Sequence, residues 1–232
     1  MKWKELKAAY PLTIPVMTGY LFLGAAYGFL MKSRGFGVGW TAIISATVFA
    51  GSMQYAGVKL LTSTFNPIYA LLITLVVNAR HSFYGISMLE KYKGIKKLKA
   101  FLIFGLVDET FSINYSHKLP QDVDKGRFYF FVTFLNYTYW IVACIIGNLI
   151  RNLFTFDTKG LDFVLTAFFV VIFIDQWISQ KNHTSALIGL LSSVICLIIF
   201  GQNRFIIPAM ILMIASLIFF KPHIEHIEKE EE

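Results

Sequence analysis

The chain has 232 residues, of which 56% are hydrophobic and only 15% are charged, with a mean hydropathy of +0.61. A soluble domain usually carries about 25% charged residues, so this composition predicts an integral membrane protein. The formal net charge of +7 is concentrated in short segments between apolar runs, which is typical of positive-inside topology and argues against nucleic-acid binding.

Apolar runs recur along the whole chain, and about 20 apolar residues suffice to span the hydrocarbon core of a bilayer. We therefore predict an all-α, polytopic membrane bundle with seven or eight helical segments, forming a single transmembrane domain over residues 1–232. The candidate segments are Tyr10–Leu30, Trp40–Leu61, Pro67–Ser87, Leu98–Tyr115, Phe128–Leu149, Leu161–Trp177, Thr184–Phe200 and Phe205–Phe220.

The first segment contains two prolines and several glycines, so we expect a kinkable and closely packed helix. Gly24 and Gly28 form a small-xxx-small pair that lets another helix approach closely. Plain packing is the favoured role for these glycines. The run lacks the small-residue cleavage site of a signal peptide, so we expect it to remain as a span.

The second segment has an unusually polar centre, in the phrase Phe49-Ala50-Gly51-Ser52-Met53-Gln54. We interpret this phrase as a possible helix break. Backbone N–H groups at the start of a half-helix suit a carboxylate ligand. Phe49, Gly51, Ser52 and Gln54 are therefore candidate substrate-binding residues.

The third segment ends with a cluster of polar side chains: Asn78, Arg80, His81 and Tyr84. Intramembrane polar groups are costly and usually pair with something or serve a pathway. Arg80 and His81 are therefore candidates for charge pairing or proton coupling; the alternative is that they snorkel toward the basic loop Lys91–Lys99. Asn78 is too short to snorkel and must bond to a neighbouring helix or line water.

The fourth segment is interrupted by two adjacent carboxylates, Asp108 and Glu109. Desolvation favours the protonated form of a carboxylate, so one of the two is a candidate proton carrier. The alternative is structural: an ion pair with Arg80, or a position at the N-terminus of a half-helix after Gly105. Both alternatives remain open from the sequence.

The basic residues lead to a contradiction in the topology. The N-terminus, with Lys2, Lys4 and Lys7, and the loop Lys91–Lys99 are both expected to be cytoplasmic. Three complete crossings would place them on opposite sides. Either the N-terminal charges do not determine the orientation, or an early segment enters the membrane and returns on the same side. The second segment is the best candidate for such a re-entrant segment, and the fourth is the next.

The remaining polar and sulfur-containing residues give weaker signals. Asn136 in the fifth segment is a further substrate-binding candidate, although holding helices together is its default role. Cys144 and Cys196 lie in apolar runs and are expected to be small buried hydrophobes. The sequence contains no enzyme motif and no metal-ligand spacing, so we expect neither an enzyme nor a cofactor.

Four ordered motifs together resemble the AzlC family of bacterial branched-chain amino acid permeases, whose large subunits include the YgaZ type. The likeness covers nearly the whole chain. The motifs are Phe49-Ala50-Gly51-Ser52-x-Gln54, Asn78-Ala79-Arg80-His81-x-x-Tyr84-Gly85, Asp108-Glu109-x-Phe111, and Gly160-x-Asp162-Phe163-x-Leu165-Thr166-Ala167-x-Phe169.

This resemblance implies export of branched-chain amino acids across the bacterial cytoplasmic membrane, with a small AzlD-type partner subunit. A zwitterionic aliphatic substrate needs a site for its carboxylate, one for its ammonium and an apolar pocket. We expect the break near Gly51 to receive the carboxylate, and Asp108 or Glu109 to receive the ammonium or a proton. Phe49, Tyr84 and Phe111 are expected to line the pocket. The alternatives are a channel or transporter for another solute, and a non-transporting membrane subunit.

Overall fold

The computed structural model describes residues 2–64, 66–117, 119, 123–151, 170, 173–174, 177–178, 183–202, 205, 208–209 and 211–220. The chain divides into two compact units, Met1–Leu165 and Thr166–Glu232, which are described separately. The fourth motif of the family resemblance, at 160–169, lies outside the described residues, as does most of the sixth predicted segment.

All regular elements in the described part of the chain are helices, which confirms the predicted fold class. The second and fourth predicted segments are each divided into two helices. The first helix is longer than predicted, because an apolar run marks only the buried part of a helix that continues through polar residues at its end. The helices are α1 (Lys2–Ser33), α2 (Val38–Val48), α3 (Gly51–Thr62), α4 (Pro67–Met88), α5 (Lys99–Phe104), α6 (Asp108–Ser116), α7 (Lys125–Ile150) and α9 (Thr184–Phe200).

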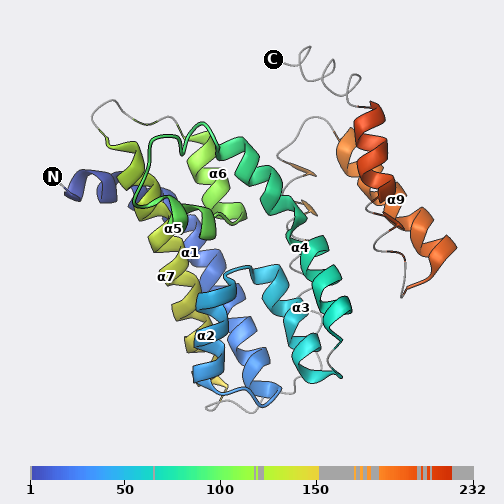
Figure 1. Ribbon diagram of the computed structural model, residues 1–232. Coiled ribbons are helices and arrows are strands. Elements are labelled where there is room, and N and C mark those ends of the chain that lie inside the picture. The colour runs from blue at the N-terminus through green and yellow to red at the C-terminus, as the bar shows by residue number, and fades with distance from the viewer. Residues whose placement is uncertain are drawn as a thin grey trace. The chain divides into compact units, whose positions relative to one another are not determined.

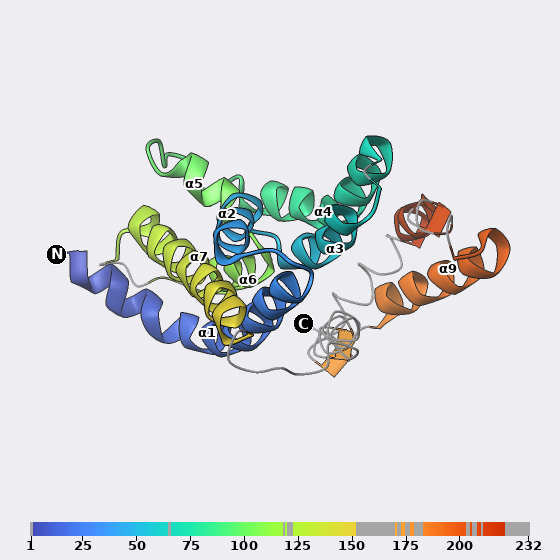
Figure 2. The ribbon, with the colours of Figure 1, turned by 90° about the horizontal axis from the view of Figure 1, so that it is seen from below.

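Helices α1 and α7 lie side by side in both ribbon views and run in the same direction (Figures 1 and 2). Gly24 faces Ala143, and one turn later a Cβ on Gly28 would collide with the backbone at Cys144. A Cβ on Gly147 would likewise collide with the backbone of Ala25. The small residues therefore let the two backbones touch, which confirms the packing role predicted for Gly24 and Gly28.

Helices α2 and α3 form a hairpin that reverses at mid-height of the first unit (Figure 1). At the open end, Asn148 of α7 donates to the Thr41 hydroxyl at 2.7 Å, and further along Tyr137 donates to the carbonyl of Ala46. After the turn, the Tyr55 hydroxyl donates to the carbonyl of Leu23, so α3 descends along α1. The hairpin returns to the end from which it entered.

Helices α5 and α6 form a second hairpin, which enters from the opposite end. Phe104 at the end of α5 packs against Phe49 at the tip of the first hairpin, with ring centroids 6.3 Å apart. Helix α6 then climbs back, so that Asn114 reaches the Tyr92 hydroxyl beyond the end of α4. The two hairpin tips therefore meet inside the unit.

Helix lengths agree with this arrangement. At 1.5 Å per residue, the 11 residues of α2 rise about 16 Å and the six of α5 about 9 Å, whereas the hydrocarbon core is about 30 Å thick. By length and composition, two described helices are suited to cross a membrane: residues Trp3–Ser33 of α1 and Lys125–Ile150, which is α7.

The hairpins resolve the contradiction in the topology. Helix α1 runs from one end of the unit to the other, the α2–α3 hairpin returns to that second end, and α4 runs back to the first end. The N-terminus and the loop Lys91–Lys99 therefore lie at the same end (Figure 1). The second segment enters and returns, as predicted, and the fourth does the same.

In the second unit, α9 has the bounds predicted for the seventh segment. Ser192 and Cys196 are its buried residues. Gly189 of the same helix lies against the Met213 side chain. Both cysteines of the chain are free and buried, as predicted.

Candidate functional site

The tip of the first hairpin is a strained break. Phe49 adopts the left-handed conformation, with φ 37° and ψ 48°, which costs a residue with a side chain about 1–3 kcal/mol. Its buried ring packs edge-on to Tyr137, with centroids 5.0 Å apart. After extended Ala50, α3 begins at Gly51 without a side-chain cap. The first N–H groups of α3 therefore lack intrahelical acceptors, as at any helix start.

The tip of the second hairpin is formed by Gly105-Leu106-Val107. Gly105 fits closely against Thr133, and a Cβ at this position would collide with that side chain. Helix α6 then begins with Asp108 and Glu109, where the helix dipole stabilises negative charge. The carboxylates thus occupy the half-helix N-terminus that one of the predicted alternatives described.

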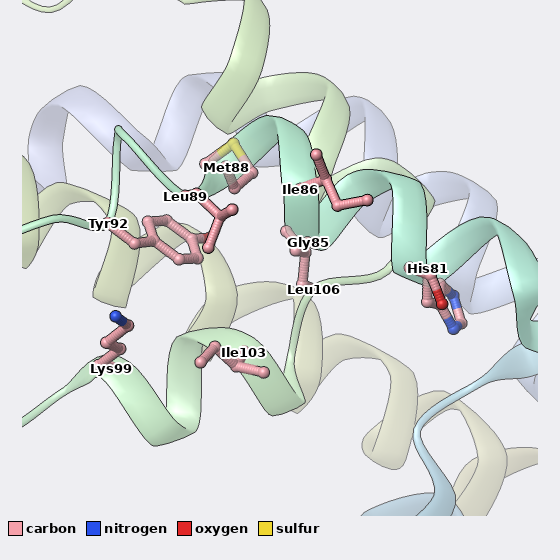
Figure 3. Close-up of a pocket in the computed structure, with 10 residues that line it drawn as sticks. His81, Gly85, Ile86, Met88, Leu89, Tyr92, Lys99, Ile103 and Leu106 are labelled. Atoms are coloured by element: carbon pink, nitrogen blue, oxygen red, sulfur yellow. The ribbon is translucent and has the colours of Figure 1, made fainter.

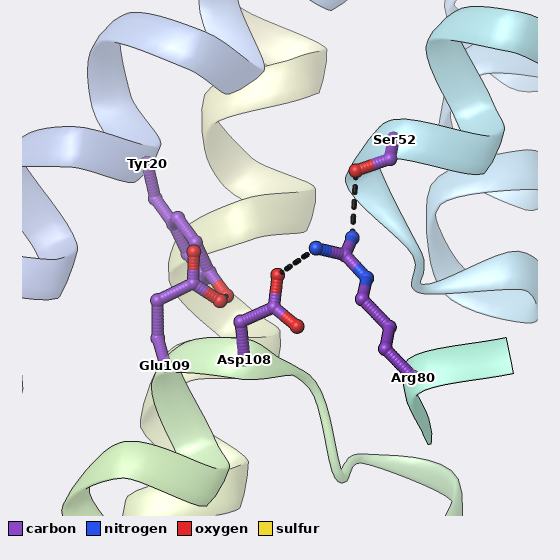
Figure 4. A network of polar contacts seen from close by, with 5 residues as sticks. All are labelled: Tyr20, Ser52, Arg80, Asp108 and Glu109. Atoms are coloured by element: carbon purple, nitrogen blue, oxygen red, sulfur yellow. Dashed lines mark hydrogen bonds and ion pairs between the residues drawn. The ribbon is translucent and has the colours of Figure 1, made fainter. Parts of the chain in front are cut away.

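Arg80 joins the two tips (Figure 4). One terminal nitrogen of its guanidinium lies 2.6 Å from Asp108 Oδ2, and the other donates to the Ser52 hydroxyl at 2.7 Å. The side chains of Arg80 and Asp108 are 32% and 29% exposed. Arg80 therefore does not snorkel to the surface but spans the starts of α3 and α6, and the pair stays partly accessible.

Glu109 points away from Arg80 toward α1 (Figure 4). The Tyr20 hydroxyl donates to Glu109 Oε2 at 2.7 Å. The Tyr20 ring meets the Trp140 ring edge-on, with centroids 5.1 Å apart. The Trp140 indole N–H donates to Gln54 Oε1 at 2.6 Å, and the same ring covers Gly51. A continuous chain of side chains therefore links Glu109 on one hairpin to Gln54 on the other.

Several buried polar atoms of this region have no hydrogen-bond partner in the described part of the chain. These atoms are Gln54 Nε2, Asn78 Oδ1, Arg80 Nε and Asp108 Oδ1. An unmet buried donor or acceptor costs about 1–3 kcal/mol. The site therefore has more hydrogen-bonding capacity than its own side chains use.

The other predicted residues occupy the surroundings of this centre. Tyr84 stacks on Phe111 at 4.5 Å, and its hydroxyl is close enough to Asp108 to interact electrostatically. Asn136 donates to the Thr110 hydroxyl at 3.2 Å and so links α7 to α6. His81 lines a groove between α4 and α5, and its ring lies 5.8 Å from the Tyr84 ring.

The sequence interpretation missed Tyr20 and Trp140. Tyr20 lies in an apolar run and Trp140 in an aromatic-rich stretch, where bulk packing is the usual role. Only the position of the two hairpin tips gives their polar atoms a partner, so the sequence carries no local signal for either residue.

A family model described as AzlC protein matches residues 15–154. The "Branched-chain amino acid transport protein AzlC" of Bacillus subtilis (strain 168) is 51% identical over 226 residues, which cover 97% of this chain and 89% of that protein. An "Uncharacterized membrane protein" of Haemophilus influenzae is 44% identical over 206 residues, covering 88% and 84%. The "Inner membrane protein YgaZ" of Escherichia coli (strain K12) is 24% identical over 211 residues, covering 86% and 82%. No solved structure matches.

Proposed function

Because the chain belongs to the AzlC family of membrane proteins, we propose that it is a secondary transporter of branched-chain amino acids. The observation that carries this proposal is the meeting of two hairpin tips around Arg80. Transporters commonly place their substrate sites at broken helices near the middle of the bilayer, where half-helix N-termini face an anionic group.

The substrate is bound through the ion pair between Arg80 and Asp108. An aliphatic amino acid carries one carboxylate, which can pair with Arg80, and one ammonium, which can pair with Asp108. When the substrate pairs with both side chains, the tip of the α5–α6 hairpin can separate from α4 while Arg80 and Asp108 each keep an oppositely charged partner. Binding is thereby coupled to hairpin movement, since breaking the pair without a replacement is costly.

The surrounding residues supply the rest of the site. The uncapped start of α3, at Gly51 and Ser52, provides N–H groups for the substrate carboxylate. The stacked rings of Tyr84 and Phe111 contact the aliphatic side chain, whereas Phe49 packs in a separate cluster against Phe104 and Tyr137. The unpartnered amide atoms of Gln54 and Asn78 orient the substrate, while Asn136 holds α7 against α6.

Glu109 is the proposed proton carrier. It lies on the same tip as Asp108 but bonds to Tyr20 instead of Arg80. One carboxylate of the tip is thus neutralised by a cation, whereas the side-chain partner of the other, among the described residues, is a neutral hydroxyl. Protonation of Glu109 would remove a charge from mid-depth without breaking the Arg80–Asp108 pair, and this supports proton-coupled export.

The protein is proposed to be a multi-pass protein of the bacterial cytoplasmic membrane, with its N-terminus in the cytoplasm. The end of the first unit that carries the N-terminus also carries most of its basic residues, which favours a cytoplasmic location. These residues are Lys2, Lys4, Lys7, Lys91, Lys93, Lys96, Lys97, Lys99, Lys125 and Arg127. The role is transport and not enzymatic catalysis, and the small AzlD-type subunit is its proposed partner.

The test is counterflow in proteoliposomes preloaded with unlabelled amino acids, with and without the partner subunit. We expect leucine, isoleucine and valine to exchange, and lysine and glutamate not to exchange. Exchange of an unrelated solute that leucine does not inhibit would support a different transporter. Absence of exchange for every amino acid, with the partner present, would reject the proposed function.

A further inference from the structure

A groove of about 470 Å³ lies outside this site, between the second half of α4 and helix α5 (Figure 3). Its floor consists of buried side chains and its walls of exposed aliphatic ones, so it opens to the surface of the first unit. The floor residues are Met88, Tyr92 and Leu106, and the wall residues are Ile86, Leu89 and Ile103.

Gly85 lines the groove and leaves open space beside it. A Cβ at this position would have no heavy atom within 4 Å. Glycine in a helix interior costs about 0.5–1 kcal/mol relative to alanine. Among the described residues, no turn and no close helix contact requires glycine at this position, so the glycine leaves room beside the groove.

The outer end of the groove is positively charged. Lys99 closes this end beside Tyr92 (Figure 3), and Lys96 and Lys97 are exposed just before it. Within the described chain, no carboxylate lies within ion-pair distance of these three lysines. The two other lysines of the loop differ: Lys91 donates to the carbonyls of Asn114 and Tyr115, and Lys93 lies 3.6 Å from Glu90.

The inner end of the groove is formed by His81 and Ser82. About 10 Å of helical rise separates His81 from Met88, where α4 ends, and His81 directly follows Arg80, which joins the two hairpin tips inside the unit. The groove therefore runs from a cationic end at the membrane surface, past aliphatic walls, to mid-depth. This order of charge and hydrocarbon is complementary to a phospholipid and not to a free anion.

We propose that this groove binds one anionic phospholipid, with its phosphate at Lys99 and an acyl chain over Gly85. Basic pockets between membrane helices commonly bind anionic headgroups. The lipid would brace α5, which is only six residues long, against α4. This proposal depends on the membrane location of the chain but not on its transport activity.

The experiment measures lipid retained by the purified protein, by native mass spectrometry, from detergent micelles that contain phosphatidylglycerol or phosphatidylcholine. We expect wild type to prefer phosphatidylglycerol, and Lys99→Gln to lose about fivefold of that preference, since a lysine near a membrane surface contributes about 1 kcal/mol. Gly85→Leu should lose retention of both lipids, because its side chain fills the groove. Lys59→Gln, which removes an exposed lysine at the opposite end of the first unit, is the matched control.

Equal retention by wild type, Lys99→Gln and Gly85→Leu would overturn the proposal. Equal retention of the two lipids by wild type would also overturn it, because the headgroup would then contribute nothing. A specific cross-link from Ile103→Cys to another polypeptide segment, in place of lipid, would have the same consequence. Lys99 is exposed, so its substitution should leave folding intact and keep the test decisive.

Discussion

Ser52 and Glu109 occupy the same position in two half-helices: each is the second residue, of α3 and α6 respectively. Each accepts a hydrogen bond from a helix outside its own hairpin, Ser52 from Arg80 of α4 and Glu109 from Tyr20 of α1. Because α1 and α4 run in opposite directions, α1–α2–α3 and α4–α5–α6 have the arrangement of an inverted repeat.

This arrangement places the open ends of the two hairpins at opposite ends of the first unit. The α2–α3 hairpin enters from one end of the first unit and α5–α6 from the other, and their tips meet at Phe49 and Phe104. Each tip is tied by a long helix of the opposite repeat. If the chain transports as proposed, releasing one of these contacts would free one hairpin while the other stays held, as alternating access requires.

The first prediction concerns topology. In intact cells, a membrane-impermeant thiol reagent should label Ser63→Cys but neither Lys7→Cys nor Lys97→Cys, because the last two lie at the end proposed to be cytoplasmic. The native cysteines are buried, so background labelling should be low. Permeabilised cells provide the control, in which all three variants should react. Labelling of Lys7→Cys and Lys97→Cys on opposite sides would contradict the two-hairpin topology.

The second prediction concerns Arg80. Arg80→Lys should reduce leucine counterflow by about tenfold or more, although the charge is kept, because one ammonium cannot reproduce the planar fork that reaches both Ser52 and Asp108. Arg127→Lys, at the start of α7 and exposed, is the matched control and should transport normally. Counterflow of Arg80→Lys at the wild-type rate would show that joining the two tips is unnecessary.

Much of this site could be predicted from the sequence, since its polar residues are expensive in a membrane and therefore stand out. The basic loop and the polar second segment together indicated a re-entrant helix. The sequence could not indicate which residues pair: Arg80 could have snorkelled, and Asp108 and Glu109 are chemically similar neighbours. Their different partners depend on how the starts of α3 and α6 meet, which is a tertiary property. Tyr20 and Trp140 were missed for the same reason.

The third prediction contrasts two glycines of the first unit. Gly28→Ala should destabilise the protein by about 1–3 kcal/mol, because even one methyl group collides with the backbone of α7. Gly85→Ala should be neutral or stabilising, by up to about 1 kcal/mol, because its methyl group meets open space in a helix. Thermal unfolding in detergent would measure both. Equal destabilisation by the two substitutions would contradict the close contact between α1 and α7.

The fourth prediction separates proton coupling from substrate binding. Glu109→Gln keeps an oxygen that can accept from the Tyr20 hydroxyl but cannot exchange a proton, so leucine counterflow should persist while transport driven by a pH gradient is lost. Tyr20→Phe is the matched variant: it removes the hydrogen bond but keeps the titratable carboxylate, so gradient-driven transport should remain. Both activities would be measured in vesicles with and without a pH gradient. Gradient-driven transport by Glu109→Gln at the wild-type rate would remove Glu109 from the mechanism and leave Asp108, held by Arg80, as the remaining carboxylate at the two tips.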